Sequence, residues 1–194
     1  MPTLRDHLVE SIEVKQRLLA DPGLLDLIEQ AADALVRTLQ AGGKVLFAGN
    51  GGSAADAQHL AGELVSRFYY DRDALAGLAL TTDTSVLTAI GNDYGYEHTF
   101  SRQVRGLGRP GDVLVGLTTS GNSKNILAAM SEARAMGMVT VGLTGRGGGR
   151  LVEAVDLCIR VPSDSTPRIQ ESHIVIGHIL CALVEERCCP RSDR

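Results

Sequence analysis

Short apolar runs alternate with helical stretches along most of the chain. Each run is almost continuously apolar, which is typical of strands covered on both faces. The runs span residues 44–48, 78–80, 113–117, 139–143 and 157–161. Between and after them, the pattern predicts helices over residues 53–67, 97–106, 123–136, 149–154 and 167–187. Strands that alternate with helices pair in parallel, so we expect a three-layer α/β/α sandwich.

The first forty residues predict two helices. Asp21-Pro22-Gly23 separates a segment over residues 4–20 from a second helix, which Asp21 is expected to cap. We expect a single domain over residues 1–194. It divides into N-terminal helices over about 4–41, an α/β core over about 44–187 and a frayed tail over 188–194. The apolar stripe of the second helix consists of Leu24, Leu27, Ile28, Ala31, Leu35 and Leu39.

Composition narrows the choice of partners. The 194 residues are 44% hydrophobic, with a formal net charge of −4 and a sequence pI near 5.7. That charge argues against nucleic acid or an anionic membrane surface as the main partner. There is no Trp, and only 4 Tyr and 3 Phe are present, so base stacking is a poor fit. The 22 Gly point instead to loops whose backbone approaches a ligand.

The cysteines and the N-terminus favour the cytoplasm. No signal peptide is visible, and no apolar stretch reaches the ~18 residues that a membrane span requires. Cys158, Cys181, Cys188 and Cys189 lack Cys-x-x-Cys spacing, so we interpret them as reduced thiols.

Two loops after predicted strands carry candidate chemistry. Gly49-Asn50-Gly51-Gly52-Ser53 offers backbone N–H groups at a helix N-terminus, although a tight turn with Ser53 as the helix cap explains it as well. Thr118-Thr119-Ser120-Gly121-Asn122-Ser123 offers hydroxyls and amides that suit a phosphate, with a simple Ser/Thr-rich turn as the alternative. The basic, glycine-rich stretch over residues 145–149 is interpreted as mostly conformational.

Histidine and carboxylate side chains recur on two predicted helices. His59 and Glu63 are four residues apart and share a helix face, whereas Gln170 and His178 are eight apart, about 80° in projection. Each histidine alone is explained by a structural role. Together the four residues offer an N/O metal site or an acid–base pair, and spacing does not choose between these.

Several motifs in a fixed order give a specific resemblance. Gly49–Ser53 followed by Asp56-Ala57-Gln58-His59 and Glu63 resembles the start of a sugar isomerase (SIS) domain. The later stretches Gly91–Gly95, Thr119–Ser123 and Arg168–His173 continue the likeness. The chain from the first helix to about residue 187 resembles the phosphoheptose (sedoheptulose 7-phosphate) isomerases.

The resemblance implies a flavodoxin-like fold with a five-stranded parallel sheet, and a homotetramer with active sites between subunits. It also implies an aldose–ketose isomerase that converts D-sedoheptulose 7-phosphate into D-glycero-D-manno-heptose 7-phosphate through an enediol. This is the first step of bacterial heptose biosynthesis, which supplies surface polysaccharide such as lipopolysaccharide. The expected partner is a small sugar phosphate, with no nucleic acid and no membrane.

The resemblance also assigns roles by matching position. Glu63 and His178 are the acid–base pair. One Zn²⁺ per subunit is held by His59, Glu63, Gln170 and His178, with no nucleotide or redox cofactor. Thr118, where many members have Ser, holds the phosphate together with Thr119, Ser120 and Ser123. The sugar is lined by Asn50, Gly51, Gly52, Ser53, Asn92 and Asp93, and substrate also meets Glu63, Arg67 and Gln170.

Two other functions fit the same fold. Proteins that associate with a DNA-replication initiator resemble this family but typically lack the residues matching Glu63 and His178, which are both present here. SIS domains also sense sugar phosphates in transcription factors, but no helix-turn-helix segment or basic extension accompanies this one. The sequence therefore favours the enzyme over both binding proteins.

Overall fold

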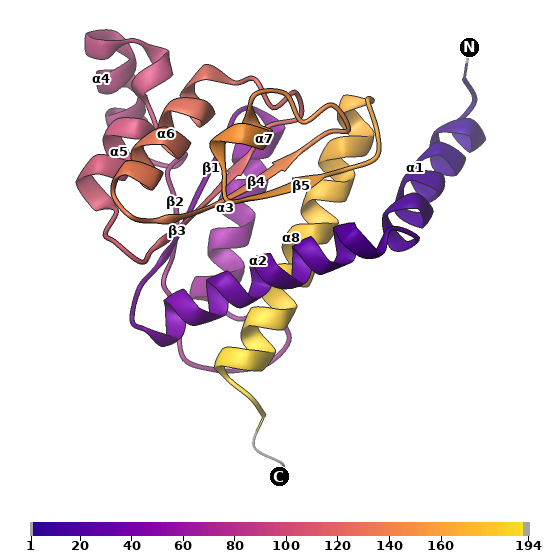
Figure 1. Cartoon of the computed structure of the whole chain (residues 1–194), viewed down its shortest axis with the longest axis horizontal. Coiled ribbons are helices and arrows are strands. Elements are labelled where there is room, and N and C mark those ends of the chain that lie inside the picture. The colour runs from indigo at the N-terminus through magenta and orange to yellow at the C-terminus, as the bar shows by residue number, and fades with distance from the viewer. Residues whose placement is uncertain (1, 192–194) are drawn as a thin grey trace.

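A computed structural model describes residues 2–191 and contains one parallel sheet (Figure 1). Its strands lie in the order β2-β1-β3-β4-β5, and all four pairings are parallel. This order reverses direction between β1 and β3, which is the switch point where ligands of such sheets bind. The strands are β1 (Val45–Gly49), β2 (Gly77–Ala79), β3 (Val113–Leu117), β4 (Val139–Thr144) and β5 (Leu157–Arg160). The predicted α/β/α sandwich is confirmed.

Helices cover both faces of the sheet because successive strand residues point to opposite sides. Val45 and Phe47 of β1 face one layer, whereas Leu46 and Ala48 face the other. The first layer comprises α1 (Leu4–Leu19), α2 (Pro22–Gln40), α3 (Gly52–Val65) and α8 (Thr166–Cys188). The second comprises α4 (Thr84–Tyr94), α5 (Ser101–Leu107), α6 (Lys124–Ala135) and α7 (Leu151–Ala154).

The two N-terminal helices begin at side-chain caps. Thr3 and Asp6 form a capping box at the start of α1, and the Asp21 carboxylate accepts a hydrogen bond of 3.1 Å from the Leu24 N–H. The predicted cap of the second helix is therefore confirmed. Figure 1 shows α1 reaching away from the sheet, and it leaves Leu8 and Ile12 exposed.

One helix was not predicted, and another is divided. Residues 84–94 form α4, capped by Asp83, whose carboxylate accepts from the Val86 N–H. None of its residues is fully buried, so it has no apolar stripe for sequence analysis to detect. The predicted helix over 97–106 is a 3₁₀ turn, η1 (Tyr96–His98), followed by α5. The other predicted elements are confirmed to within a few residues.

The predicted frayed tail, 188–194, lies partly outside the described residues. Cys188 is the last residue of α8, and the Cys189 carbonyl accepts a hydrogen bond of 3.0 Å from the Tyr70 hydroxyl. Residues 192–194 are not described. Within residues 2–191, no helix combines the length and apolarity needed to cross a membrane.

Candidate active site

The loop after β1 makes a tight turn into α3. A Cβ at Gly49 would collide with the Ser53 backbone, and Gly51, with φ of +57°, is the N-cap residue. Ser53 is buried and makes no capping hydrogen bond, so the alternative of a Ser53 helix cap is wrong. A Cβ at Gly52 would lie 2.7 Å from Nε2 of Gln170, which places the Gln170 amide directly over the loop.

The side chain of Asn50 is held by a buried partner. Asn50 and Asn125 exchange two hydrogen bonds of 2.9 and 2.8 Å between their amides, and the Tyr96 hydroxyl donates to Asn50 Oδ1 at 3.1 Å. Both polar atoms of the Asn50 side chain therefore have partners within the protein. Asn125 was not identified from the sequence. The sequence feature that could have identified Asn125 is its position two residues after Ser123, the last residue of the Thr118–Ser123 loop.

His59, Glu63 and His178 converge although they come from α3 and α8. His59 Nε2 lies 2.9 Å from His178 Nε2 and 3.2 Å from Glu63 Oε1. One ligand atom from each residue falls within 4.8 Å of the others. Around a zinc ion with bonds of about 2.0–2.1 Å, neighbouring ligand atoms lie roughly 3.3 Å apart. The donor set and its spacing therefore fit a zinc ion. The Gln170 amide lies over Gly52, seven residues before His59 on α3, and is not among these three side chains.

Asp56 lies one helical turn before His59 on α3. Its Oδ2 atom is buried and has no hydrogen-bond partner among residues 2–191. Burial raises the pKa of this carboxyl, and the nearby His59 and His178 rings partly offset the rise. Asp56 belongs to the motif that carries the family resemblance, without a role of its own. Its i, i+3 spacing to His59 predicts that the two side chains lie near each other.

The loop after β3 presents hydroxyls at the start of α6. Thr118 is buried, and its hydroxyl lies 2.8 Å from that of Ser123, the N-cap residue of α6. Ser120 is exposed, and its hydroxyl accepts from the Asn122 N–H at 3.1 Å. The Ser123 side chain makes no capping bond, and the Ile126 N–H donates to Asn125 Oδ1 at 3.0 Å, so the N–H groups of Lys124 and Asn125 are those of the first turn of α6 that could meet an anion.

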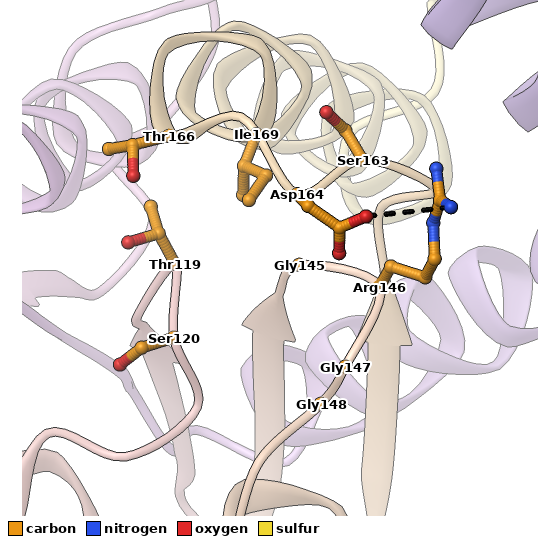
Figure 2. Close-up of a pocket in the computed structure, with 10 residues that line it drawn as sticks. All are labelled: Thr119, Ser120, Gly145, Arg146, Gly147, Gly148, Ser163, Asp164, Thr166 and Ile169. Carbon is orange, nitrogen blue, oxygen red and sulfur yellow. Dashed lines mark ion pairs between the residues drawn. The ribbon is translucent and has the colours of Figure 1, made fainter.

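A pocket of about 260 Å³ opens beside this loop (Figure 2). Arg146 and Asp164 come from the loops after β4 and β5, and their ion pair of 3.5 Å lies at one side of it. Residues 145–148, part of the stretch that we interpret as mostly conformational, therefore also line a pocket. The lining consists of Thr119, Ser120, Gly145, Arg146, Gly147, Gly148, Ser163, Asp164, Thr166 and Ile169.

Three residues assigned by resemblance, Asn92, Asp93 and Arg67, are exposed. Asn92 and Asp93 lie exposed on α4, where the Asn92 amide donates to the Asp93 carboxylate at 2.8 Å. Among the described residues, no hydrogen bond joins either one to His59, Glu63 or His178. Arg67 is exposed just beyond α3. Their assignment to substrate stays a prediction.

The chain is similar to known proteins along most of its length. The SIS domain family matches residues 13–145. The chain is 61% identical over 183 residues to a phosphoheptose isomerase of Aneurinibacillus thermoaerophilus, covering 94% of this chain and 92% of that protein. It is 63% identical over 158 residues to that of Akkermansia muciniphila, covering 81% and 84% of the two chains. The solved phosphoheptose isomerase of Neisseria gonorrhoeae superposes with a TM-score of 0.89 at 47% identity, covering 94% of this chain and 97% of that one.

Proposed function

The chain belongs to the phosphoheptose isomerases of the SIS domain family, and on that premise we propose that it converts D-sedoheptulose 7-phosphate into D-glycero-D-manno-heptose 7-phosphate. The observation that carries the proposal is the meeting of His59, Glu63 and His178 between α3 and α8, in a chain 61% identical to a named phosphoheptose isomerase. The reaction is an aldose–ketose isomerisation. It begins bacterial heptose biosynthesis, which supplies surface polysaccharide such as lipopolysaccharide.

The isomerisation moves a proton between C1 and C2 through an enediol. We assign that transfer to the Glu63 carboxylate, and proton exchange at the sugar oxygens to the His178 imidazole. His59 Nε2 lies 3.2 Å from the first group and 2.9 Å from the second. It therefore holds both side chains toward the same space.

The phosphate of the substrate is assigned to the loop over residues 118–123. Hydroxyls of Thr118, Thr119, Ser120 and Ser123, together with the N-terminus of α6, supply neutral donors for it. The sugar then extends toward the backbone of residues 50–53 and Gln170. Recognition by hydrogen bonds is consistent with the scarcity of aromatic residues in this chain.

A zinc ion is part of the proposal. His59, Glu63 and His178 would hold it, with Gln170 as the fourth ligand. When bound, zinc polarises the substrate carbonyl and stabilises the negative charge that develops on the enediol oxygens.

Metal removal tests this assignment. Protein dialysed against a strong chelator is expected to lose isomerase activity and to melt at a lower temperature, because a ligand of the folded state stabilises it by mass action. Added Zn²⁺ should restore both, while Mg²⁺, which prefers oxygen ligands, should not. Full activity in protein shown by elemental analysis to be free of metal would contradict the zinc assignment.

We further infer that residues 1–194 form one domain and that four copies assemble. Both hydrophobic layers share the single sheet, and the exposed Leu8 and Ile12 of α1 support association with further copies. We place the reaction in the cytoplasm, where the four free cysteines would stay reduced.

The direct test is turnover of sedoheptulose 7-phosphate. Purified protein, with and without Zn²⁺, is incubated with the ketose, and the aldose C1 proton is followed by NMR. In D₂O, deuterium at C2 of the product would identify proton transfer through an enediol. Absence of turnover under both conditions would overturn the enzyme function in favour of a binding protein.

A further inference from the structure

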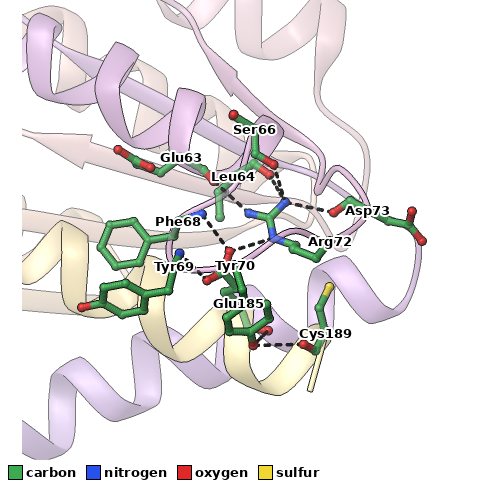
Figure 3. Close-up of polar contacts among 10 residues, drawn as sticks. All are labelled: Glu63, Leu64, Ser66, Phe68, Tyr69, Tyr70, Arg72, Asp73, Glu185 and Cys189. Carbon is green, nitrogen blue, oxygen red and sulfur yellow. Dashed lines mark hydrogen bonds and ion pairs between the residues drawn. The ribbon is translucent and has the colours of Figure 1, made fainter. Parts of the chain in front are cut away.

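A buried ion pair lies between the end of α3 and the end of α8, outside the proposed catalytic groups (Figure 3). Arg72 Nε lies 3.1 Å from Glu185 Oε1, and the two side chains are 3% and 1% exposed. The Phe68 and Tyr69 N–H groups each donate to the Glu185 carboxylate at 2.7 Å. We call Arg72, Glu185 and the two N–H groups the helix clamp.

The Arg72 guanidinium also caps the C-terminus of α3 by donating to backbone carbonyls there. Its other nitrogens donate to the Glu63 carbonyl at 2.8 Å and the Leu64 carbonyl at 2.8 Å. Two further bonds go to the carbonyls of Ser66 and Asp73. The carbonyls at a helix C-terminus have no partner within the helix, so one side chain here satisfies several of them. Arg72 thereby fixes the backbone of Glu63 itself.

The clamp reaches His178 from the other side. Phe68, whose N–H is bound by Glu185, places its ring 5.5 Å from the His178 ring. Glu185 lies on α8 seven residues after His178, about two turns along the same face. The clamp therefore contacts the Glu63 backbone directly, and it reaches the His178 ring through Phe68.

Stability alone does not account for such a pair. Burial by itself would raise the pKa of the Glu185 carboxyl, but the Phe68 and Tyr69 N–H groups and Arg72 outweigh it and lower the pKa. The carboxylate is therefore kept charged in the interior. Apolar side chains of similar volume are often as stable as a buried ion pair, whereas an ion pair with many hydrogen bonds fixes geometry.

We propose that Arg72 and Glu185 are positioning residues of the isomerase site, which set the placement of Glu63 on α3 relative to His178 on α8. This inference rests on the proposed function and identifies residues that act through others.

Arg72→Lys and Glu185→Gln test the proposal. Lysine keeps the charge but lacks the planar five-donor group that reaches several carbonyls, and glutamine keeps the shape but not the charge. The matched control is Arg187→Lys, two residues from Glu185 on α8. Its ion pairs with Glu29 and Asp33 of α2, at 2.9 and 2.7 Å, touch neither α3 nor the loop.

Three quantities are measured at a temperature where circular dichroism shows every variant folded: kcat, KM and the affinity for Zn²⁺ by competition with a coloured chelator. We expect the clamp variants to lose about 10- to 100-fold in kcat and in Zn²⁺ affinity, with KM nearly unchanged, because displaced supporting contacts misplace the ligands. The control should match the parent protein in all three. If kcat and Zn²⁺ affinity of both clamp variants stay within about twofold of the control, the proposal is overturned.

The metal measurement separates this proposal from the proposed function. Zn²⁺ affinity requires no substrate, so its loss in the clamp variants supports positioning even if the parent protein turns over no sedoheptulose 7-phosphate. Should Arg72→Lys fail to fold, Glu185→Gln, which keeps the arginine over the end of α3, decides the same comparison.

Discussion

Glu63 and His178 come together although they lie on α3 and α8. Along the chain they are separated by four of the five strands, the four helices of the second layer and η1. Their proximity depends on the packing of two helices rather than on local sequence. His59, which contacts both side chains, is 119 residues from His178. Single substitutions in this group therefore test chemistry with little effect on the core.

Glu63→Gln and His178→Gln are each expected to lower kcat by about 10²- to 10⁴-fold, the usual contribution of a general acid or base. Both side chains are only partly buried, so the melting temperature of metal-free protein should change little. Glu153→Gln and His7→Gln, at exposed positions, serve as controls and should retain full turnover. Near-normal kcat in either site variant would remove that residue from the mechanism.

His173 is fully buried on α8 and takes no part in the proposed chemistry. Burial lowers the pKa of its imidazole to about 4, and the backbone of Thr144 only partly opposes this. In the unfolded chain the pKa is about 6.5, so the unfolded state binds the proton more readily. Stability contributed by the neutral ring is therefore present above pH 6.5 and is lost as the pH falls toward 4, by roughly 3 kcal/mol.

His173→Leu should flatten the fall in the free energy of unfolding between pH 6.5 and pH 4, since leucine does not titrate. Within residues 2–191 neither ring nitrogen of His173 has a hydrogen-bond partner of good geometry, so an apolar side chain leaves no partner unsatisfied. Urea unfolding at several pH values measures the slope. The exposed His98→Gln is the control, and an unchanged slope in His173→Leu would contradict the assignment.

Individual site residues could be predicted from the sequence where histidine and carboxylate side chains recur at helical spacing. His59 and Glu63 could be predicted to lie together because residues four apart on a helix share one face. Arg72 and Glu185 were not, since each looks like an ordinary surface charge until the fold buries both. Asn125 was missed for the same reason: its role depends on contact with Asn50, 75 residues away.

At the scale of elements, the candidate site consists of loops that support one another. Gly121, in the loop after β3, lies so close to the loop after β4 that a Cβ would collide with the Gly148 carbonyl. The Leu151 N–H donates back to the Gly121 carbonyl at 3.0 Å. The shape of the predicted phosphate loop therefore depends on glycines in both loops.

Gly121→Ala combines a backbone strain at φ of +67° with this collision. Gly42→Ala is the matched control, with φ of +79° and open space around the new methyl group. The strain alone costs about 1–2 kcal/mol. We expect Gly121→Ala to lose measurably more stability than Gly42→Ala in urea unfolding, and to raise KM for sedoheptulose 7-phosphate, while the control keeps KM. Equal effects of the two variants would mean that the loops adjust freely.

Elements with buried faces were predictable, and the exposed one was not. The central strands β1, β3 and β4 are buried on both sides almost throughout, so their nearly continuous apolar runs predict buried strands. In contrast, α4 is held by its Asp83 cap and by the partly buried Leu87, and its Gly91-Asn92-Asp93 stretch resembles a loop. The order of the strands follows from the right-handed crossovers only once the neighbours of β1 are known.

At the scale of the whole molecule, α1 presents apolar side chains away from the core. Leu8 and Ile12 are 59% and 56% exposed, one turn apart on the same face. Leu8→Glu combined with Ile12→Glu is expected to convert the proposed tetramer into smaller species, because burying a charge opposite apolar residues is unfavourable. Light scattering after size-exclusion chromatography measures the mass. Val152→Glu on α7 is the control, and an unchanged mass for the double variant would exclude α1 from the interface.

The placement of Gln170, His178 and Glu185 on α8 has a consequence for biosynthesis. All five strands leave the ribosome before this helix does. Until α8 emerges, the sheet lacks one of the helices that cover it. The apolar faces of α2 and α3 are exposed until Ile176, Leu180 and Val184 of α8 pack against them. At 5–20 residues per second the 23 residues of α8 take on the order of seconds to synthesise. During that interval the apolar faces of α2, α3 and the sheet stay uncovered, and the candidate site lacks Gln170 and His178.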